Sequence, residues 1–267
     1  MVAVLGAADL PSAGLVIDLD AAKGLRVEDG NRVAGWTSQG EGGYIFVQRD
    51  EGRVEPGGGR PTLRKSVPEL GGKPALVFRQ QELVCLDEDA FDGLSTGKGH
   101  TWIALLAAHE QRVGLEDVNS FFGNLRNQGG KFEGIWGCLN DDNTVWWGAR
   151  NGVTFGRFDA NNPKLQGPRL ELGKFHLLAG RMGAGTGTVK LELFVDGGCP
   201  VAVGEVRVNP AADPSRMAIG QERDAIQHPG HESFDGELAR FLVWARPLAD
   251  DEFESVMKQL RASYFAR

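Results

Sequence analysis

The side chains best suited to bind a ligand lie close together in the middle third of the sequence. They are three tryptophans, Trp136, Trp146 and Trp147, together with Arg150 and Asn140. Sugar rings stack on flat aromatic faces, and arginine and amide groups fix their orientation through hydrogen bonds. Because side chains alternate along a strand, Trp146 and Arg150 share one face while Trp147 points to the other. We therefore predict Trp146 and Arg150 as an exposed ligand-binding pair, with Trp136 and Asn140 beside them; alternatively, Trp136 and Trp147 only fill the interior.

Two further regions have residue types that suit acid–base chemistry, and the first is acidic. Residues 87–92, with Glu82 upstream, hold a dense run of carboxylates. A glycosidase needs two carboxylates beside the scissile bond, and burial must raise the pKa of the one that acts as the acid. The glycine-rich, acidic composition of residues 87–99 is typical of a loop. We interpret these carboxylates as solvated rather than catalytic.

The second region contains His228 and His231, next to Gln227 and Glu232. A polysaccharide lyase uses a basic group to accept a proton, and a further polar group neutralises the uronate of its substrate. The two histidines are therefore candidates for a lyase site. The default interpretation of this polar stretch is a plain surface loop.

Acidic pairs occur at two other places where a hard cation such as calcium, which takes several oxygen ligands, would find carboxylates. Asp18 and Asp20 lie on one face of the first predicted strand, and Asp141 and Asp142 lie on a turn. None of them matches the spacing of an EF-hand loop. Structural calcium is therefore a hypothesis with these four residues as candidates, and no other cofactor is predicted.

Many short strands carry these candidates. Apolar residues alternate with polar ones or form short runs between glycine-rich turns, which is typical of an antiparallel sandwich. The apolar run Thr101–Ala108 predicts a central strand that is buried on both faces. Residues 175–181 and 189–195 predict a hairpin, and another hairpin joins the two tryptophan-bearing segments. Residues 40–72 and 87–99 are predicted to be loops.

The end of the sequence predicts a strand followed by a helix. Leu238, Phe241 and Val243 supply the apolar side of the strand. Pro247 ends it, because the proline ring removes a ladder donor and fixes φ. Acidic residues then begin a helix near Asp250, where they offset the positive end of the helix dipole.

Length and composition exclude several classes of protein. The 267 residues suit one large all-β domain, and the 38 glycines are about twice the usual share of roughly 7%, as many turns require. The net charge of -7 provides no basic footprint for nucleic acid. No apolar run approaches the roughly twenty residues that span a bilayer, and no signal peptide is visible. With three cysteines, at least one thiol is unpaired within the chain, and we predict buried free thiols.

Five blocks of sequence, in the same order, resemble those of bacterial laminin G-like domains in the concanavalin A-like superfamily. The matching stretches are Leu15–Ala21, Asp29–Trp36, Arg60–Leu63 with Gly72–Phe78, Phe175–Gly180 with Leu193–Gly197, and Phe234–Gly236 with the terminal strand and helix. The resemblance implies two packed antiparallel sheets, one of them concave, a structural calcium at the rim, and a location outside the cell or at its surface. The family commonly places an acidic residue where this chain has Ala239 and Arg240, so a role tied to that acid is not carried over.

These observations lead to one reading of the whole chain. We predict a single domain over residues 1–267, an all-β, two-sheet antiparallel jelly-roll sandwich with a short C-terminal helix. Its predicted function is that of a non-catalytic, lectin-like module that binds a glycan or a protein, with no nucleic acid partner and no membrane span. The first alternative is a polysaccharide-degrading enzyme, a lyase or a glycoside hydrolase, on the same scaffold. The second is a structural or adhesive module of a surface assembly, because fold alone does not fix function.

Overall fold

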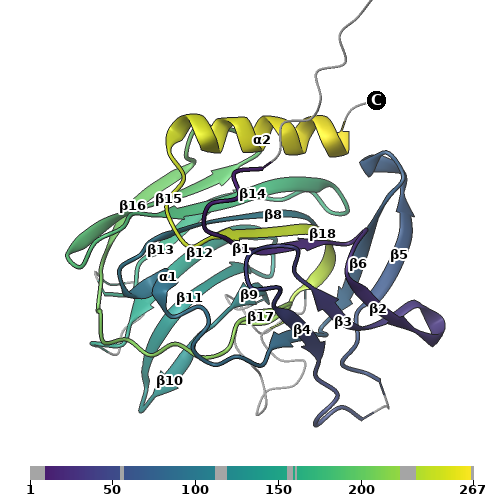
Figure 1. The fold of residues 1–267 in the computed structure, drawn as a ribbon, viewed down its shortest axis with the longest axis horizontal. Helices are drawn as coiled ribbons and strands as arrows, with labels where there is room; N and C mark the ends of the chain where they lie inside the picture. The colour runs from purple at the N-terminus through teal and green to yellow at the C-terminus, as the bar shows by residue number, and fades with distance from the viewer. Residues whose placement is uncertain are drawn as a thin grey trace, which may run out of the picture.

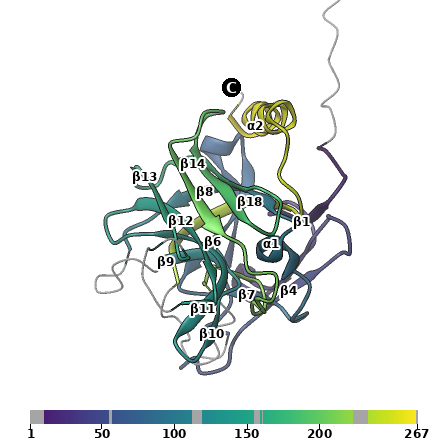
Figure 2. The same cartoon turned by 90° about the vertical axis from the view of Figure 1, so that its left-hand side faces the viewer.

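The fold class predicted from the sequence is confirmed by a computed structural model. The model describes residues 10–54, 57–111, 119–154, 159, 161–222 and 233–265. In this part of the chain, two antiparallel sheets pack face to face, and one helix, α2 (Asp250–Phe265), covers the outer face of one of them (Figures 1 and 2). We call that sheet the helix-side sheet and the other the facing sheet.

The helix-side sheet is built around the long strand β18 (Asp235–Trp244). One edge of β18 pairs with β8 (His100–Ala108) along nearly its whole length. The other edge is shared: its first residues pair with β6 (Lys73–Arg79) and its last residues with β1 (Leu15–Asp20). The sheet continues beyond β6 through β5 (Thr62–Val67), and beyond β8 through β14 (Phe175–Met182), β15 (Thr188–Val195) and β16 (Ala202–Arg207). The first and last strands of the chain therefore lie side by side.

The facing sheet contains the tryptophan-bearing hairpin. Its strands follow the order β13 (Lys164–Arg169), β12 (Thr144–Asn151), β11 (Lys131–Leu139), β9 (Asn119–Gly123), β17 (Ala218–Ile219), β7 (Leu83–Cys85), β4 (Ile45–Gln48), β3 (Arg32–Thr37) and β2 (Leu25–Glu28). The short strand β10 (Arg126–Gln128) pairs with the start of β11. A single residue pair, Arg32 with Thr62, joins this sheet to β5 of the helix-side sheet.

The main core lies between the two sheets and is rich in aromatic side chains. Trp102 of β8 lies 6.0 Å from Trp147 and 5.1 Å from Phe122, measured between ring centroids. Burying a side chain of this size stabilises the fold by roughly 1.5–3 kcal/mol. The alternate residues of β8, such as Ile103 and Leu105, belong to the second apolar cluster, beneath α2. All nine residues of β8 are buried, so the predicted central strand is confirmed.

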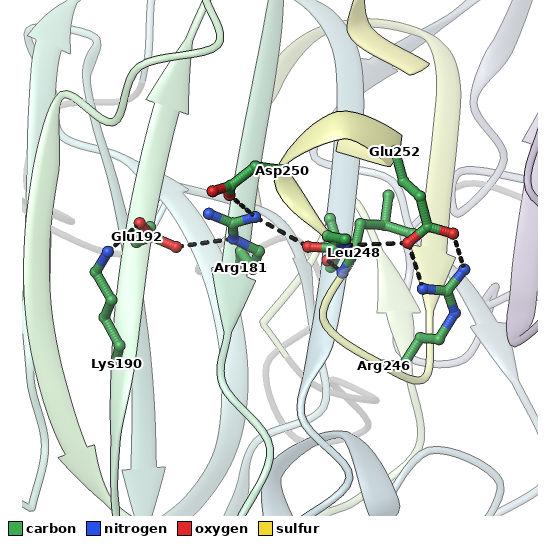
Figure 3. Close-up of polar contacts among 9 residues, drawn as sticks. Arg181, Lys190, Glu192, Arg246, Leu248, Asp250 and Glu252 are labelled. Atoms are coloured by element: carbon green, nitrogen blue, oxygen red, sulfur yellow. Dashed lines mark hydrogen bonds and ion pairs between the residues drawn. The ribbon is translucent and has the colours of Figure 1, made fainter. Parts of the chain in front are cut away.

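Helix α2 is held on its sheet by an apolar face and by ion pairs at its N-terminal end. Phe253 packs on Phe194 of β15 with ring centroids 4.4 Å apart, and Val256, Met257 and Leu260 continue the same face. At the N-terminal end, the Arg181 guanidinium donates to Glu192 and to the carbonyl oxygen of Leu248 (Figure 3). The helix predicted from Asp250 onward is therefore confirmed, and it ends at Phe265.

The two predicted loop regions contain short elements that the composition did not indicate. Residues 40–72 include β4, β5 and a 3-10 turn at Pro68–Leu70, and residues 87–99 include the one-turn helix α1 (Gly93–Thr96). The prediction of uninterrupted loops is wrong because β4 is only four residues long and β5 is mostly polar, and pairing with β3, β6 and β7 rather than their own pattern makes them strands.

Both predicted hairpins are present. The β14–β15 pair runs in register from Leu178 to Met182, and the β11–β12 turn is closed by Asn143, whose φ is 67°. Cys85 and Cys138 are buried free thiols as predicted, whereas Cys199 is exposed in the turn after β15, so the thiol prediction is wrong for that residue. In the described part of the chain, no helix has the length and apolarity needed to cross a membrane.

Candidate functional site

The predicted ligand-binding residues lie on the outer face of the facing sheet, as the alternation of side chains requires. Trp147 points inward and belongs to the main core, whereas Trp146 and Trp136 point outward. Trp136 and Trp146 form a T-shaped pair with ring centroids 5.0 Å apart, and each ring is only 1% exposed. The prediction that Trp146 is exposed is therefore wrong: together with Leu125 and Cys138, the two rings form a small apolar cluster of their own.

Two cations and an amide lie against this buried pair. The Arg150 guanidinium lies 5.0 Å from the ring centroid of Trp136, and Lys164 Nζ lies 4.4 Å from that of Trp146. Lys164 Nζ also donates to the Asn140 side-chain oxygen at 3.4 Å. Cation–π contacts of this kind stabilise by roughly 0.5–1 kcal/mol at exposed sites and more where water is excluded. The polar groups that a ligand would meet on this face are thus Arg150, Lys164 and Asn140, each half-buried, rather than the flat tryptophan faces.

The first pair of calcium candidates is occupied by an internal cation. Arg240 of β18 reaches Asp18 at 2.6 Å and Asp20 at 2.5 Å on the neighbouring strand β1. Burial raises the pKa of the Asp18 carboxyl, against the attraction of the Arg240 charge. Both carboxylates therefore have a counter-ion within the protein, and a calcium role for Asp18 and Asp20 stays a prediction.

The second pair of calcium candidates closes the β11–β12 hairpin. Asp142 accepts a hydrogen bond from the Thr144 backbone N–H at 2.9 Å, and this bonding lowers the pKa of its carboxyl. Asp141 accepts one from the Asn119 side chain at 3.3 Å. These contacts explain both residues as turn-forming, and a calcium role for them stays a prediction.

A third acidic group brings together residues far apart in the sequence. Oxygen atoms of Asp89, Asp92 and Asp213 all lie within 4.8 Å of one another. Among the described residues, these three carboxylates have the spacing of metal ligands. Burial, followed by the charge of Asp213, raises the pKa of Asp92 to about 6. The sequence contained half of this signal, the acidic run at 87–92. It did not show Asp213, which joins the group only through the fold.

The residues Gly93–Gly97 read Gly-Leu-Ser-Thr-Gly, which is the spacing of a hydrolase nucleophile elbow. They were not among the residues for which the sequence predicted a function. Such an elbow requires a strand–turn–helix with an exposed serine. Here Ser95 is 7% exposed, lies in the one-turn helix α1 and donates to the carbonyl oxygen of Asp92. The stretch is therefore a helical turn and not a nucleophile. The lyase candidates His228 and His231 lie outside the described residues.

A polar hollow lies elsewhere, beside the C-terminal end of α2. Its volume is about 530 Å³, and the Asp18, Asp20 and Arg240 group forms part of its lining. Tyr264 of α2, 5% exposed, also lines it, and burial raises the pKa of its hydroxyl. A volume of this size is within the range of small-molecule sites in proteins.

The fold of this chain, an antiparallel β-sandwich, is similar to that of several solved structures. A Trypanosoma rangeli sialidase in complex with the inhibitor DANA is similar over 96% of this chain and 34% of its own, with a TM-score of 0.54 and 17% sequence identity. The binding domain of Paraclostridial Mosquitocidal Protein 1 is similar over 91% of this chain and 52% of its own, with a TM-score of 0.53 and 10% identity. This chain thus spans about a third of the one structure and half of the other.

Identities this low show a shared fold and nothing finer. No family model matches the sequence, and no curated protein is detectably similar to it. The sandwich expected from the sequence is therefore confirmed, and both the concanavalin A-like superfamily and the laminin G-like assignment within it stay predictions.

Proposed function

We propose that this protein is a non-catalytic module that binds carbohydrate on the outer face of the facing sheet. The observation that carries the proposal is the arrangement of Arg150 and Lys164, two cations that the buried rings of Trp136 and Trp146 fix in place 5.0 and 4.4 Å above them. Pre-organised donors lose little conformational entropy when a ligand binds.

In this proposal the tryptophans support the site instead of stacking on sugar. Each ring holds one cation, and the edge-to-face contact between the two rings fixes the distance between the cations. Asn140, bonded to Lys164, adds an amide beside them. Guanidinium, ammonium and amide groups suit the hydroxyl and acidic groups of a glycan. A glycan-binding role is in keeping with the extracellular or cell-surface location that the family resemblance implies.

Titration of the purified protein with a panel of neutral and acidic polysaccharides tests the proposal, with tryptophan fluorescence as the readout. Trp136 and Trp146 lie directly beneath the proposed contacts, so binding there changes their emission. Arg150→Gln and Lys164→Gln are each expected to weaken binding by about tenfold, the effect of losing one charged contact. Lys258→Gln, an exposed lysine on α2, is the matched control and leaves affinity unchanged.

Two results would contradict the proposal. The first is saturable binding that neither Arg150→Gln nor Lys164→Gln weakens, which would move the site elsewhere. The second is release of new reducing ends or unsaturated products from the panel, which would make the protein an enzyme. If no glycan binds, a protein ligand or the structural role becomes the better explanation.

One observation favours a second candidate function, hydrolysis of a glycosidic bond at Asp92. A general acid needs a raised pKa beside a second, ionised carboxylate, and retaining glycosidases hold the two roughly 5–5.5 Å apart. Asp92, with its pKa of about 6, has Asp89 and Asp213 within 4.8 Å. Hydrolysis that is lost in Asp92→Asn and declines above pH 6 would support this candidate. Activity unchanged in Asp92→Asn would eliminate it.

A further inference from the structure

The outermost strands of the two sheets differ in how well they are protected against pairing with another chain. In the described part of the chain these strands are β5 and β16 on the helix-side sheet, and β2 and β13 on the facing sheet. Register shifts interrupt the pairing of β2, β5 and β13 with their neighbours, and β13 also contains Pro168. Bulges and prolines keep an edge strand from pairing with a further strand. These three edges are therefore protected.

Strand β16 lacks these features. Its six residues, Ala202–Arg207, pair with β15 without a register shift and include no proline and no lysine. Val203 is 56% exposed, and Val201, just before the strand, is 46% exposed. Figure 1 shows β16 beyond β15, at the left end of the helix-side sheet. A regular edge strand with exposed apolar side chains is a template for pairing with another chain.

The hydrogen-bond pattern shows which backbone groups of β16 point away from β15. The Val208 N–H donates to the Gly187 carbonyl oxygen at 2.9 Å, and these two residues continue the register of the two strands. Hydrogen-bonded and non-hydrogen-bonded residues alternate along an antiparallel pair, so the N–H and C=O groups of Val203 and Glu205 point to the open edge. No described residue bonds to them there. A further strand would therefore find donors and acceptors at these two residues.

We propose that β16 binds β16 of a second copy of this chain, antiparallel to it and about a two-fold axis at Gly204. Val203 then lies opposite Glu205 of the second copy, and by symmetry Glu205 lies opposite its Val203. Each open N–H and C=O group of these residues gains a partner. A register shifted toward Arg207 is less suitable, because the Arg207 carbonyl oxygen already accepts a hydrogen bond from Asn151 Nδ2 at 2.9 Å.

The residues of β16 suit an identical partner. The two Gly204 residues form a non-hydrogen-bonded pair on the axis, where the backbones come closest, and neither has a side chain there. The exposed Val203 side chains of the two copies are diagonal neighbours on the outer face of the sheet and cover each other. Glu205 and Arg207 give the strand no net charge, so two copies meet without net repulsion.

Sedimentation velocity of the full-length protein measures the association. Pairing of two edge strands buries little surface, so the concentration series runs from about 1 to about 500 μM, a range that detects weak interfaces. We expect the protein to change from monomer to dimer within this range. The experiment contains no glycan, and β16 shares no residue with the proposed glycan face. Its outcome is therefore independent of the proposed function.

Two substitutions of opposite charge at Val203 test the register. In Val203→Glu the new carboxylate lies opposite Glu205 of the second copy, and like charges at directly opposite positions destabilise a strand pair. We expect the dissociation constant of the dimer to rise at least about tenfold. In Val203→Lys the new charge is opposite to that of Glu205, and the dissociation constant is expected to stay at or below that of the wild type.

A proline at the same position tests the backbone hydrogen bonds. Val203→Pro removes an N–H that bonds only to the second copy, and an edge strand tolerates proline where the N–H faces solvent. The dimer is expected to be lost, whereas the unfolding midpoint of the dilute monomer stays close to that of the wild type. Val203→Thr keeps both the N–H and the branched shape of the side chain, and as the control it remains a dimer.

Spin labels on Cys199 measure the geometry of the dimer. Cys199 is exposed, whereas Cys85 and Cys138 are buried, so each copy takes up one label. Cys199 precedes Gly204 by five residues, so about ten residues of chain separate the two labels across the axis. At about 3.4 Å per residue, double electron–electron resonance is expected to give a distance of roughly 30–35 Å.

Any of four results would overturn the proposal. The first is a protein that stays monomeric over the whole concentration series, and the second is equal association of Val203→Glu and Val203→Lys. The third is a folded Val203→Pro variant that still forms the dimer. The fourth is a dimer whose label distance lies well outside roughly 30–35 Å, which would place the contact on another surface or in another register.

Discussion

The two ends of helix α2 use the same chemistry to different effect. At the N-terminal end, Arg181 binds Glu192 and Asp250, and its guanidinium also donates to the Leu248 carbonyl oxygen (Figure 3). At the C-terminal end, Arg240 binds Asp18, Asp20 and the Tyr264 hydroxyl, and an open hollow of about 530 Å³ remains beside them. Both arginine side chains are 13% exposed. The Arg181 guanidinium links the helix to the sheet, whereas the Arg240 guanidinium lines the hollow.

The difference teaches that residue type does not decide whether a charged group is structural or available to a ligand. Phe194 and Phe253 pack at 5.6 and 5.7 Å from the Arg181 guanidinium, so little room for a ligand is left there. At the other end, small or flexible side chains, Ser12, Ser263 and Gln259, surround the ion pairs. The space that neighbouring side chains leave open distinguishes the two ends.

Removal of Arg240 should produce the largest effect. In Arg240→Met, Asp18 and Asp20 become buried carboxylates without a counter-ion, and we expect the free energy of unfolding to fall by about 3–5 kcal/mol. Urea unfolding followed by tryptophan fluorescence measures this loss. The triple variant Asp18→Asn/Asp20→Asn/Arg240→Met has no stranded charge and should regain most of it. A triple variant as unstable as Arg240→Met would mean that shape, not charge, holds this end together.

Removal of Arg181 should cost less, although its side chain is as buried as that of Arg240. In Arg181→Met, Glu192 keeps Lys190, whose Nζ lies 2.5 Å away, so its charge is not left alone. Asp250 is 92% exposed and returns to water. We expect a loss of about 2 kcal/mol in the same unfolding experiment. A loss larger than that of Arg240→Met would reverse the ranking and contradict the comparison.

Calcium binding provides a further test of the comparison, because a calcium ion can bind Asp18 and Asp20 only where the Arg240 charge has been removed. In Arg240→Gln, Asp18 and Asp20 face each other across a vacated position and become a carboxylate pair that a hard cation can bind. Free calcium at about ten times its dissociation constant would then restore about 1.4 kcal/mol of unfolding free energy. The double variant Asp18→Asn/Arg240→Gln should not respond. A wild-type protein that gains as much as Arg240→Gln would show that calcium acts elsewhere.

The pattern of the sequence correctly predicted the structural features that depend on residues close together in the chain. Alternation placed Trp146 and Trp147 on opposite faces, and helical spacing found the apolar side of α2. What failed depends on partners far along the chain. The internal counter-ion of Asp18 and Asp20 was not predicted, because nothing near them in sequence indicates Arg240, 220 residues away from Asp20. Trp146 was expected to be exposed for the same reason: Lys164 and Trp136 cover it only after the sheet has formed.

The smallest effect concerns Glu252, which caps the N-terminal end of α2. Its carboxylate binds Arg246 through two contacts of 2.7 Å and accepts the Ala249 backbone N–H at 3.0 Å. The side-chain bond from Arg246, followed by the bond from Ala249, lowers the pKa of Glu252 from 4.5 to about 2. A lowered carboxyl pKa stabilises the fold above the unfolded value and loses that contribution as the pH falls toward the folded value.

The Glu252→Gln variant should therefore be less stable than the wild type by about 0.5 kcal/mol at pH 7, a small value because both partners are about a third exposed to solvent. The difference should shrink between pH 4.5 and pH 2, where the wild-type carboxyl takes up its proton. Unfolding curves of the two proteins at a series of pH values measure it. A gap that stays constant across this range would mean that Glu252 acts through its shape and its hydrogen bonds alone, which glutamine retains in part. In that case the packing around Arg181, and not the charge of Glu252, would hold the N-terminal end of α2 on the sheet.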